Sequence, residues 1–207
     1  MILPDGPEAH LKAAAMIRAG EVIAFRTDTF YGLGVDPQNP TAVNRLNELK
    51  GREGKPILLL VAATADVDRF VAYRSALFDR VAAEFWPGPL TLVAKARAEL
   101  PELLTAGTGT IGVRLPVDAT VRELVRLCGG ALTATSANLS GFPPARTATE
   151  VATQFPTGID LIIDSGEVDA TEPSTVLDVT GDEPRLIREG AIGWEALRQS
   201  IKEIRRG

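Results

Sequence analysis

Short apolar runs alternate with helix-like segments along the whole chain, and this alternation limits the fold more than any other feature of the sequence. Runs that are β-branched or Leu-rich and bounded by Gly or Pro predict strands at 22–26, 57–61, 91–95, 111–115, 131–135, 161–164, 175–179 and 185–187. Helical patterns predict helices at 8–18, 41–49, 75–85, 118–127, 147–154 and 194–206. Such alternation is typical of an α/β or α+β domain built around one main sheet.

The spacing of these strands favours a mixed sheet over a purely parallel one. A Gly-rich link joins the strands at 91–95 and 111–115, and the last two strands have the spacing of a hairpin. The runs at 57–61 and 161–163 are apolar on both faces, which predicts central, buried strands. The predicted architecture is therefore a mixed sheet with helices on its faces.

The length of the chain predicts one domain. A chain of 207 residues suits a single domain with a substantial core, and no segment has the composition of a linker. We expect the domain to span 1–207, with its core at about 8–190 and a C-terminal helix at 194–206.

Charge and cysteine content narrow the classes of function and the compartment. A formal charge of −5 argues against a broad, sequence-blind nucleic-acid coat and leaves room for a local basic groove. The single cysteine, Cys128, has no internal disulfide partner, which fits a reducing compartment. The first residues lack the basic and apolar regions of a signal peptide, and no run is long enough to span a membrane. We therefore expect a cytoplasmic protein without a membrane anchor.

Spacing and composition argue against three familiar kinds of site. Residues 107–112 spell the pattern G-x-G-x-x-G, but a predicted strand follows them where a dinucleotide-binding fold needs a helix. This segment is either an ordinary loop or a loop whose Thr hydroxyls and amides touch a phosphate. With His10 and Cys128 as the only histidine and cysteine, a zinc cage is effectively excluded, and a single histidine near the N-terminus argues against Ser-His-Asp catalysis.

Cations and small polar side chains stand at the mouths of two predicted strands. Lys50, Arg52 and Lys55 precede the run at 57–61, whereas Ser136 and Asn138 follow the run at 131–135. Each group has an ordinary alternative, a solvated helix end for the first and a strand cap for the second. Together they suggest a site for a polyanion, because binding residues gather on loops at strand ends.

Two further features favour a polar substrate. The loop at 27–34 combines small polar side chains, an aromatic pair and two glycines, which fits either a tight loop or a cradle for a small ligand. Arg114 stands in the middle of an apolar strand and needs an anionic partner, either a structural carboxylate or that of a substrate.

Taken in order, these segments resemble the YrdC-type threonylcarbamoyl-AMP synthase family. The resemblance covers nearly the whole chain and is carried by the loop at 27–34, Lys50-Gly51-Arg52, Phe-Trp-Pro-Gly-Pro-Leu-Thr at 85–91, Val-Arg-Leu-Pro at 113–116, Ser136-Ala137-Asn138, Pro-Ser-Thr-Val-Leu-Asp at 173–178 and Arg-Glu-Gly at 188–190. Long members of the family carry a second domain after a linker, so this chain resembles the short form.

The resemblance implies a fold, a reaction and partners. The fold is a twisted open α/β sheet with a concave, basic face. The reaction joins L-threonine, bicarbonate and ATP into threonylcarbamoyl-AMP and releases pyrophosphate. A partner enzyme complex then transfers the threonylcarbamoyl group to the adenosine beside the tRNA anticodon. Magnesium is expected with ATP, not in a protein cage.

The resemblance also implies roles for individual residues. The phosphates and the chemical step fall to Lys50, Arg52, Lys55, Ser136 and Asn138. The rest of the nucleotide site falls to Thr110, Pro144 and Arg188. Arg114 is expected to hold the threonine carboxylate in a bidentate fork, and the other threonine contacts are Thr29, Ser174 and the backbone near Ala134. No side chain stands out as a general base.

Two other classes of function stay open on the sequence. One is an RNA-binding factor that matures tRNA or ribosomal RNA through contacts to double-stranded RNA on the basic face, although the charge of −5 weighs against it. The other is a related carbamoyl-transfer domain of the kind found within larger maturation proteins.

Overall fold

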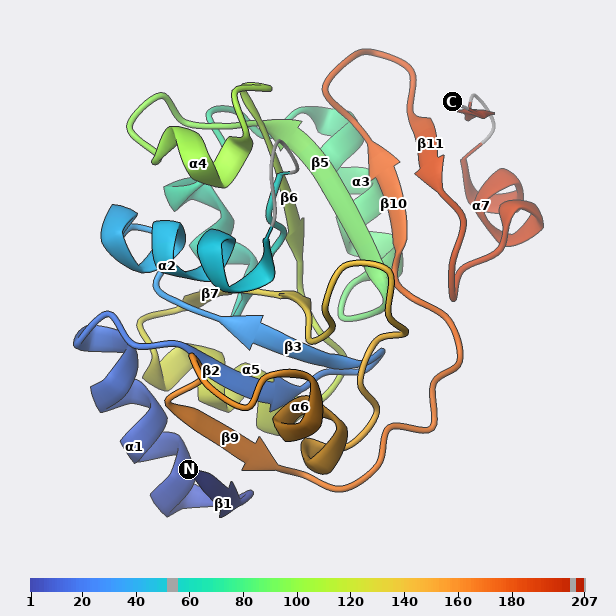
Figure 1. Ribbon diagram of the computed structural model, residues 1–207. Coiled ribbons are helices and arrows are strands. Elements are labelled where there is room, and N and C mark those ends of the chain that lie inside the picture. Colours follow the sequence, from blue (N-terminus) through green and yellow to red (C-terminus); the bar gives the residue numbers. More distant parts are fainter. Residues whose placement is uncertain (52–55, 202–203, 207) are drawn as a thin grey trace.

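Two mixed β-sheets, flanked by helices, form the framework of the protein (Figure 1). The computed structural model describes residues 1–51, 56–201 and 204–206. The α/β class with mixed sheets and flanking helices is confirmed, but the strands are divided between two sheets and do not form one main sheet. The helices are α1 (Pro7–Arg18), α2 (Pro40–Lys50), α3 (Ala76–Phe85), α4 (Glu102–Thr105), α5 (Ala119–Leu127), α6 (Ala148–Gln154) and α7 (Trp194–Ser200), with a 3-10 helix at Thr64–Arg69.

The smaller sheet has five strands in the order β1-β9-β2-β3-β8, and the larger has seven in the order β12-β11-β10-β5-β6-β4-β7. The smaller sheet contains β1 (Ile2–Pro4), β2 (Ile23–Arg26), β3 (Tyr31–Gly34), β8 (Thr135–Ser136) and β9 (Leu161–Asp164). The larger contains β4 (Leu59–Val61), β5 (Leu90–Lys95), β6 (Thr110–Arg114), β7 (Ala131–Thr133), β10 (Thr175–Asp178), β11 (Arg185–Arg188) and β12 (Arg205–Arg206).

The pairing within the sheets agrees with three predictions. Both sheets mix parallel and antiparallel pairs, and β10 forms the expected antiparallel hairpin with β11. Strands β4 and β9, whose sequences are apolar on both faces, each lie between two other strands. A strand whose two faces are both covered by other parts of the protein needs no polar side, which explains why the sequences of β4 and β9 are apolar throughout.

One strand-like run of the sequence is divided between the two sheets. Strand β7 pairs with β4 in the larger sheet, and β8 pairs with β3 in the smaller one. Between them stands Ala134, whose N–H donates to the carbonyl of Leu58 over 2.8 Å. A single residue therefore carries the chain from one sheet to the other.

Two predictions of secondary structure are wrong. Residues 31–34, expected within a loop, form the buried strand β3, because the chain folds back on β2 and its two glycines allow close packing. A Cβ at Gly34 would lie 2.7 Å from Cε1 of Phe25. The C-terminal helix, expected at 194–206, ends at Ser200, and residues 205–206 form β12 beside β11. The helix stops because Ile201 adopts an extended conformation, and its side chain is buried.

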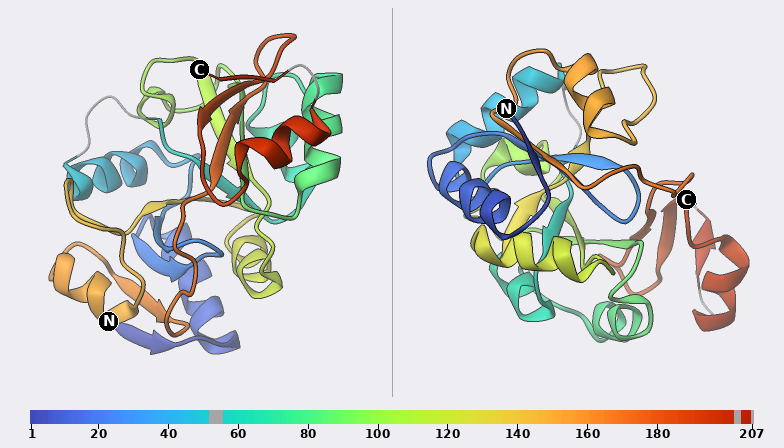
Figure 2. Two further views of the ribbon diagram at one scale, coloured as in Figure 1. Left: turned by 90° about the vertical axis from the view of Figure 1, so that its right-hand side faces the viewer. Right: turned by 90° about the horizontal axis from the view of Figure 1, so that it is seen from below.

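The two termini lie at opposite ends of the molecule, and α7 covers the outer side of the β10–β11 hairpin (Figures 1 and 2). Among the described residues, no helix is long and apolar enough to cross a membrane. The boundaries predicted for the domain and its core stay a prediction.

The connection from β9 to β10 is tied to the smaller sheet by Tyr31. This side chain is fully buried, and its hydroxyl donates to the carbonyl of Gly166 over 2.8 Å and accepts from the N–H of Ser165 over 3.1 Å. Buried hydroxyls need such partners, and burial also raises the pKa of Tyr31. The bond fixes the start of a segment that runs from one sheet to the other.

Candidate functional site

A pocket of about 720 Å³ lies where the two sheets meet. The smaller sheet contributes the β2–β3 turn, β3 and β8, and the larger contributes β5, β6, β10, β11 and the segment 56–58 that precedes β4. Residues Thr171, Pro173 and Ser174 of the β9–β10 connection complete the wall. The pocket therefore joins segments that are far apart in the sequence.

The pocket gathers most of the residues that the sequence singled out. The predicted site residues among its lining are Thr29, Thr110, Arg114, Ala134, Ser136, Pro144, Ser174 and Arg188. Lys50 and Asn138 are not part of this lining but hydrogen-bond to Ser136, which is, whereas Arg52 and Lys55 fall outside the described residues. The functional roles assigned to all of these residues stay predictions.

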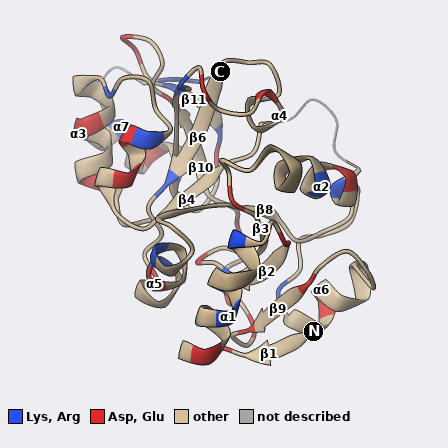
Figure 3. Cartoon of the chain, turned by 90° about the vertical axis from the view of Figure 1, so that its left-hand side faces the viewer, with Lys and Arg blue, Asp and Glu red and all other residues tan. Residues whose placement is uncertain are grey.

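The described lining of the pocket is positively charged. Its charged side chains are Arg114 and Arg188, and it includes no carboxylate in the described part of the chain. Elsewhere, acidic and basic residues are interspersed over the helices (Figure 3). The pocket can therefore attract an anion although the chain carries a net charge of −5.

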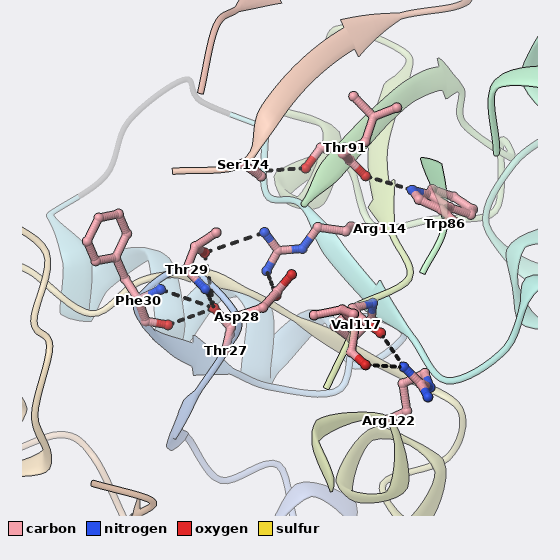
Figure 4. A network of polar contacts seen from close by, with 12 residues as sticks. Thr27, Asp28, Thr29, Phe30, Trp86, Thr91, Arg114, Val117, Arg122 and Ser174 are labelled. Atoms are coloured by element: carbon pink, nitrogen blue, oxygen red, sulfur yellow. Dashed lines mark hydrogen bonds and ion pairs between the residues drawn. The ribbon is translucent and has the colours of Figure 1, made fainter. Parts of the chain in front are cut away.

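Arg114, on β6, is almost completely buried and forms an ion pair. Its Nη2 lies 3.1 Å from Oδ1 of Asp28, and its Nη1 donates to Oγ1 of Thr29 over 3.4 Å (Figure 4). Burial lowers the pKa of Arg114, the charge of Asp28 opposes this effect, and Arg188 adds to it. Of the two partners that the sequence left open, the structure supplies a structural carboxylate.

The turn before β3 is held by one hydroxyl. Oγ1 of Thr27 accepts from the N–H groups of Thr29 (3.2 Å) and Phe30 (3.3 Å) and donates to the carbonyl of Phe30 over 2.7 Å. Threonine hydroxyls stabilise turns in this way. The turn brings Asp28 and Thr29 to the same guanidinium, so this loop is tight and also lines the pocket.

A second group of polar side chains lies on β5, on β11 and at Ser174, directly before β10. Oγ of Ser174 lies 3.0 Å from Oγ1 of Thr91. Arg188 donates from Nη2 to the carbonyl (2.7 Å) and the hydroxyl (3.2 Å) of Ser174. The register shift of the β10–β11 hairpin between Val176 and Leu177 lies next to this contact. Burial lowers the pKa of Arg188.

Lys50 connects the end of α2 to the Ser136–Asn138 turn. Its Nζ donates to the carbonyl of Ser136 over 2.6 Å, to the carbonyl of Asn138 and to Oδ1 of Asn138 over 3.3 Å. The hydroxyl of Ser136 donates to the same Oδ1 over 2.5 Å. Lys50 is buried, so the alternative of a solvated helix end is wrong for this residue. Lys50 is therefore in direct contact with the Ser136-Ala137-Asn138 motif.

Asp28 and Thr91 were assigned no functional role on sequence grounds. Asp28 could have been found, because Arg114 required a carboxylate and Asp28 stands beside Thr29, a predicted site residue. Thr91 belongs to one of the segments that carried the family resemblance, but its position beside Ser174 depends on the parallel pairing of β5 with β10.

The comparison with known families identifies the chain's relatives. The Sua5_yciO_yrdC family model, described as "Telomere recombination", matches residues 15–190. The chain belongs to this family. A threonylcarbamoyl-AMP synthase of Idiomarina loihiensis is 38% identical over 174 residues, which cover 80% of this chain and 90% of the relative. One from Pyrococcus abyssi is 37% identical over 194 residues, or 93% of this chain, but this match spans only 57% of the relative's length.

Solved structures of this family share the fold. A variant of P. abyssi Sua5 superposes with a TM-score of 0.96 at 34% identity, covering 100% of this chain and 65% of that one. P. abyssi Sua5 complexed with L-threonine superposes with a TM-score of 0.93 at 35% identity, covering 100% and 62%. Full-length HypF, at 20% identity and a TM-score of 0.77, covers 88% of this chain and 29% of that one, and this likeness concerns the fold alone.

Proposed function

We propose that the protein is a threonylcarbamoyl-AMP synthase that uses L-threonine, bicarbonate and ATP. The observation that carries the proposal is the positively charged pocket around Arg114, in a chain that superposes on a threonine-bound Sua5. Relatives that this chain matches over most of their length bear the same name, including one from Klebsiella pneumoniae at 38% identity over 98% of its length.

The reaction requires the pocket to bring three anions together. The threonine amine and bicarbonate give a carbamate and water. A carbamate oxygen then attacks the α-phosphate of ATP, and pyrophosphate leaves with the electron pair of the broken P–O bond. Little of this depends on covalent help from the protein, so positioning and charge stabilisation should dominate. Cationic walls offset the mutual repulsion of the carbamate, the threonine carboxylate and the triphosphate.

The residues divide between threonine and ATP. Arg114, Thr29, Ser174 and the backbone near Ala134 face the amino acid, and Arg114 takes its carboxylate. Thr110, Pro144, Ser136 and Arg188 face the nucleotide, with Arg52 and Lys55 on the phosphates. The oxygen atoms of Ser136 and Asn138 are suited to magnesium, which would enter with ATP and neutralise phosphate charge. The product would pass to a threonylcarbamoyl transferase complex that acts on tRNA.

Omitting threonine is expected to reduce pyrophosphate release from ATP to the background rate. The reason is that the attacking oxygen belongs to the threonine carbamate, so ATP cleavage should depend on the amino acid. The measurement is pyrophosphate release with ATP, magnesium and bicarbonate, with and without L-threonine. A rate that does not change on omission rejects the synthase. Tight, steeply salt-dependent RNA binding without this activity would favour the RNA-binding alternative.

Ser136→Ala and Arg52→Ala are each expected to lower turnover by about tenfold or more, because each removes a hydrogen bond to a charged group. The Ser136 side chain is exposed, so its loss should leave the free energy of unfolding unchanged. Steady-state turnover and urea unfolding of the purified variants test this. A variant that unfolds instead indicates a structural role for its segment.

A further inference from the structure

Asp28 and Arg114 form a buried ion pair whose hydrogen bonding is incomplete. Their side chains are 7% and 3% exposed, and Nη2 of Arg114 lies 3.1 Å from Oδ1 of Asp28. In the part of the chain that the structure describes, three of their atoms have no hydrogen-bond partner of good geometry. These atoms are the two carboxylate oxygens of Asp28 and Nε of Arg114. The contact is therefore electrostatic, and three buried polar atoms are left unpaired.

Such a pair is difficult to explain by stability of the fold. Removing two charges from water is compensated only where further hydrogen bonds satisfy their remaining atoms, and apolar residues of similar volume usually stabilise a protein as well or better. Buried polar atoms without partners are uncommon, and at the edge of a pocket they favour a functional role over a purely structural one.

The two residues lie differently with respect to the pocket. Arg114 lines it, whereas Asp28 does not. Asp28 and Thr29 come from the same turn and approach the guanidinium from one side (Figure 4). The carboxylate of Asp28 therefore holds the arginine from behind, and it is too enclosed to take a proton directly from a molecule in the pocket.

The charge of Asp28 also affects the state of Arg114. Burial and the nearby Arg188 both disfavour the cation, and Asp28 is the carboxylate that opposes them. An arginine that must receive a carboxylate needs its charge and a fixed orientation, because bidentate pairing requires the guanidinium to lie in the plane of its partner.

We propose that Asp28 is the positioning residue of the amino-acid site, which holds the Arg114 guanidinium so that its remaining N–H donors meet the α-carboxylate of threonine. This inference rests on the proposed function, since it assigns a further residue to the same site. The inference concerns only the contact to the carboxylate of threonine. A ligand that lacks this carboxylate should therefore be insensitive to changes at Asp28.

The test compares binding of L-threonine and L-threoninamide, which lacks the carboxylate, to the wild type and to Asp28→Asn. Titration calorimetry measures both ligands, and pyrophosphate release gives KM for threonine and for ATP. Asp28→Asn is expected to weaken threonine binding by at least about tenfold, because truncating one partner of a buried charge pair disturbs the other. Binding of threoninamide and KM for ATP should stay within about threefold of the wild type, since neither involves the carboxylate contact.

Two variants separate positioning from folding. Asp160→Asn makes the same change in another Asp–Arg pair, where Asp160 lies 3.0 Å from Arg45 and outside the pocket. Asp160→Asn should keep the preference for threonine over threoninamide whether or not it lowers the free energy of unfolding. Asp28→Glu keeps the charge and displaces it by one methylene, so it should lose this preference even if Asp28→Asn does not fold.

The outcomes separate this inference from the proposed function. If the wild type releases pyrophosphate with threonine and the Asp28 variants keep its preference for threonine, Asp28 is not a positioning residue and the synthase stands. If the wild type neither binds threonine nor releases pyrophosphate, both the synthase and the inference are rejected. Selective loss of threonine binding in the Asp28 variants supports the inference.

Discussion

Lys50→Met is expected to lower turnover by about a hundredfold, because displacing a catalytic group by even 1 Å has an effect of that order. The substitution keeps the length of the side chain but removes the cation that accounts for the hydrogen bonds to Ser136 and Asn138. The oxygen atoms of Ser136 and Asn138 would lose this donor, and the turn that carries the Ser136 hydroxyl would shift. Steady-state kinetics with ATP and threonine measure the effect.

Lys12→Met is the matched control, since Lys12 is an exposed lysine of α1 and should leave turnover unchanged. A double variant tests the route of the effect. If Lys50 acts through the turn, combining Lys50→Met with Ser136→Ala should be little worse than Lys50→Met alone, because coupled residues are not additive. Effects that multiply would indicate that Lys50 acts on the phosphates directly, and unchanged turnover in Lys50→Met would contradict the prediction.

Gly190→Ala is expected to destabilise the protein by about 1–3 kcal/mol, the usual cost of forcing an extra methyl group into packed structure. A Cβ at Gly190 would lie 2.2 Å from the carbonyl oxygen of Pro173 and 2.9 Å from the carbonyl carbon of Ser174. These are main-chain atoms of the pocket wall, so relief requires movement of the backbone that holds Ser174. Both the free energy of unfolding in urea and KM for threonine should therefore change.

Gly181→Ala provides the comparison, because a Cβ at Gly181 meets nothing within 4 Å. It should leave both quantities unchanged. If Gly190→Ala unfolds at the same urea concentration as the wild type, the wall can move without cost and the close approach is not a constraint.

Local pattern predicted most elements of the fold, and tertiary contacts explain the exceptions. Strands β4 and β9 were predicted as interior strands because their side chains are apolar on both faces, and each lies between two other strands. The division of 131–136 into β7 and β8 depends on which strands lie alongside, and this information is not local. Strand β3 was missed because its two glycines suit a loop equally well until the chain pairs with β2 and Phe25 packs against Gly34.

The candidate site also depends on contacts that the local sequence does not predict. The ordered segments of the family pointed to Arg114, Ser174 and Ser136, which the structure brings to one pocket. They did not predict that Lys50 would turn toward main-chain carbonyls, because the path of a long side chain depends on what surrounds it. Asp28 was within reach of the sequence argument, but only the fold shows that it, and no other described carboxylate, pairs with Arg114.

The single-residue passage at Ala134 has a consequence for the energetics of binding. The wall from the larger sheet and the wall from the smaller one are joined there without slack, and Ala134 itself is bonded to Leu58. Walls fixed in this way lose little conformational entropy when a ligand arrives, so more of each contact is expressed as affinity. Lengthening the passage by inserting one glycine should therefore weaken binding mainly through its entropic part.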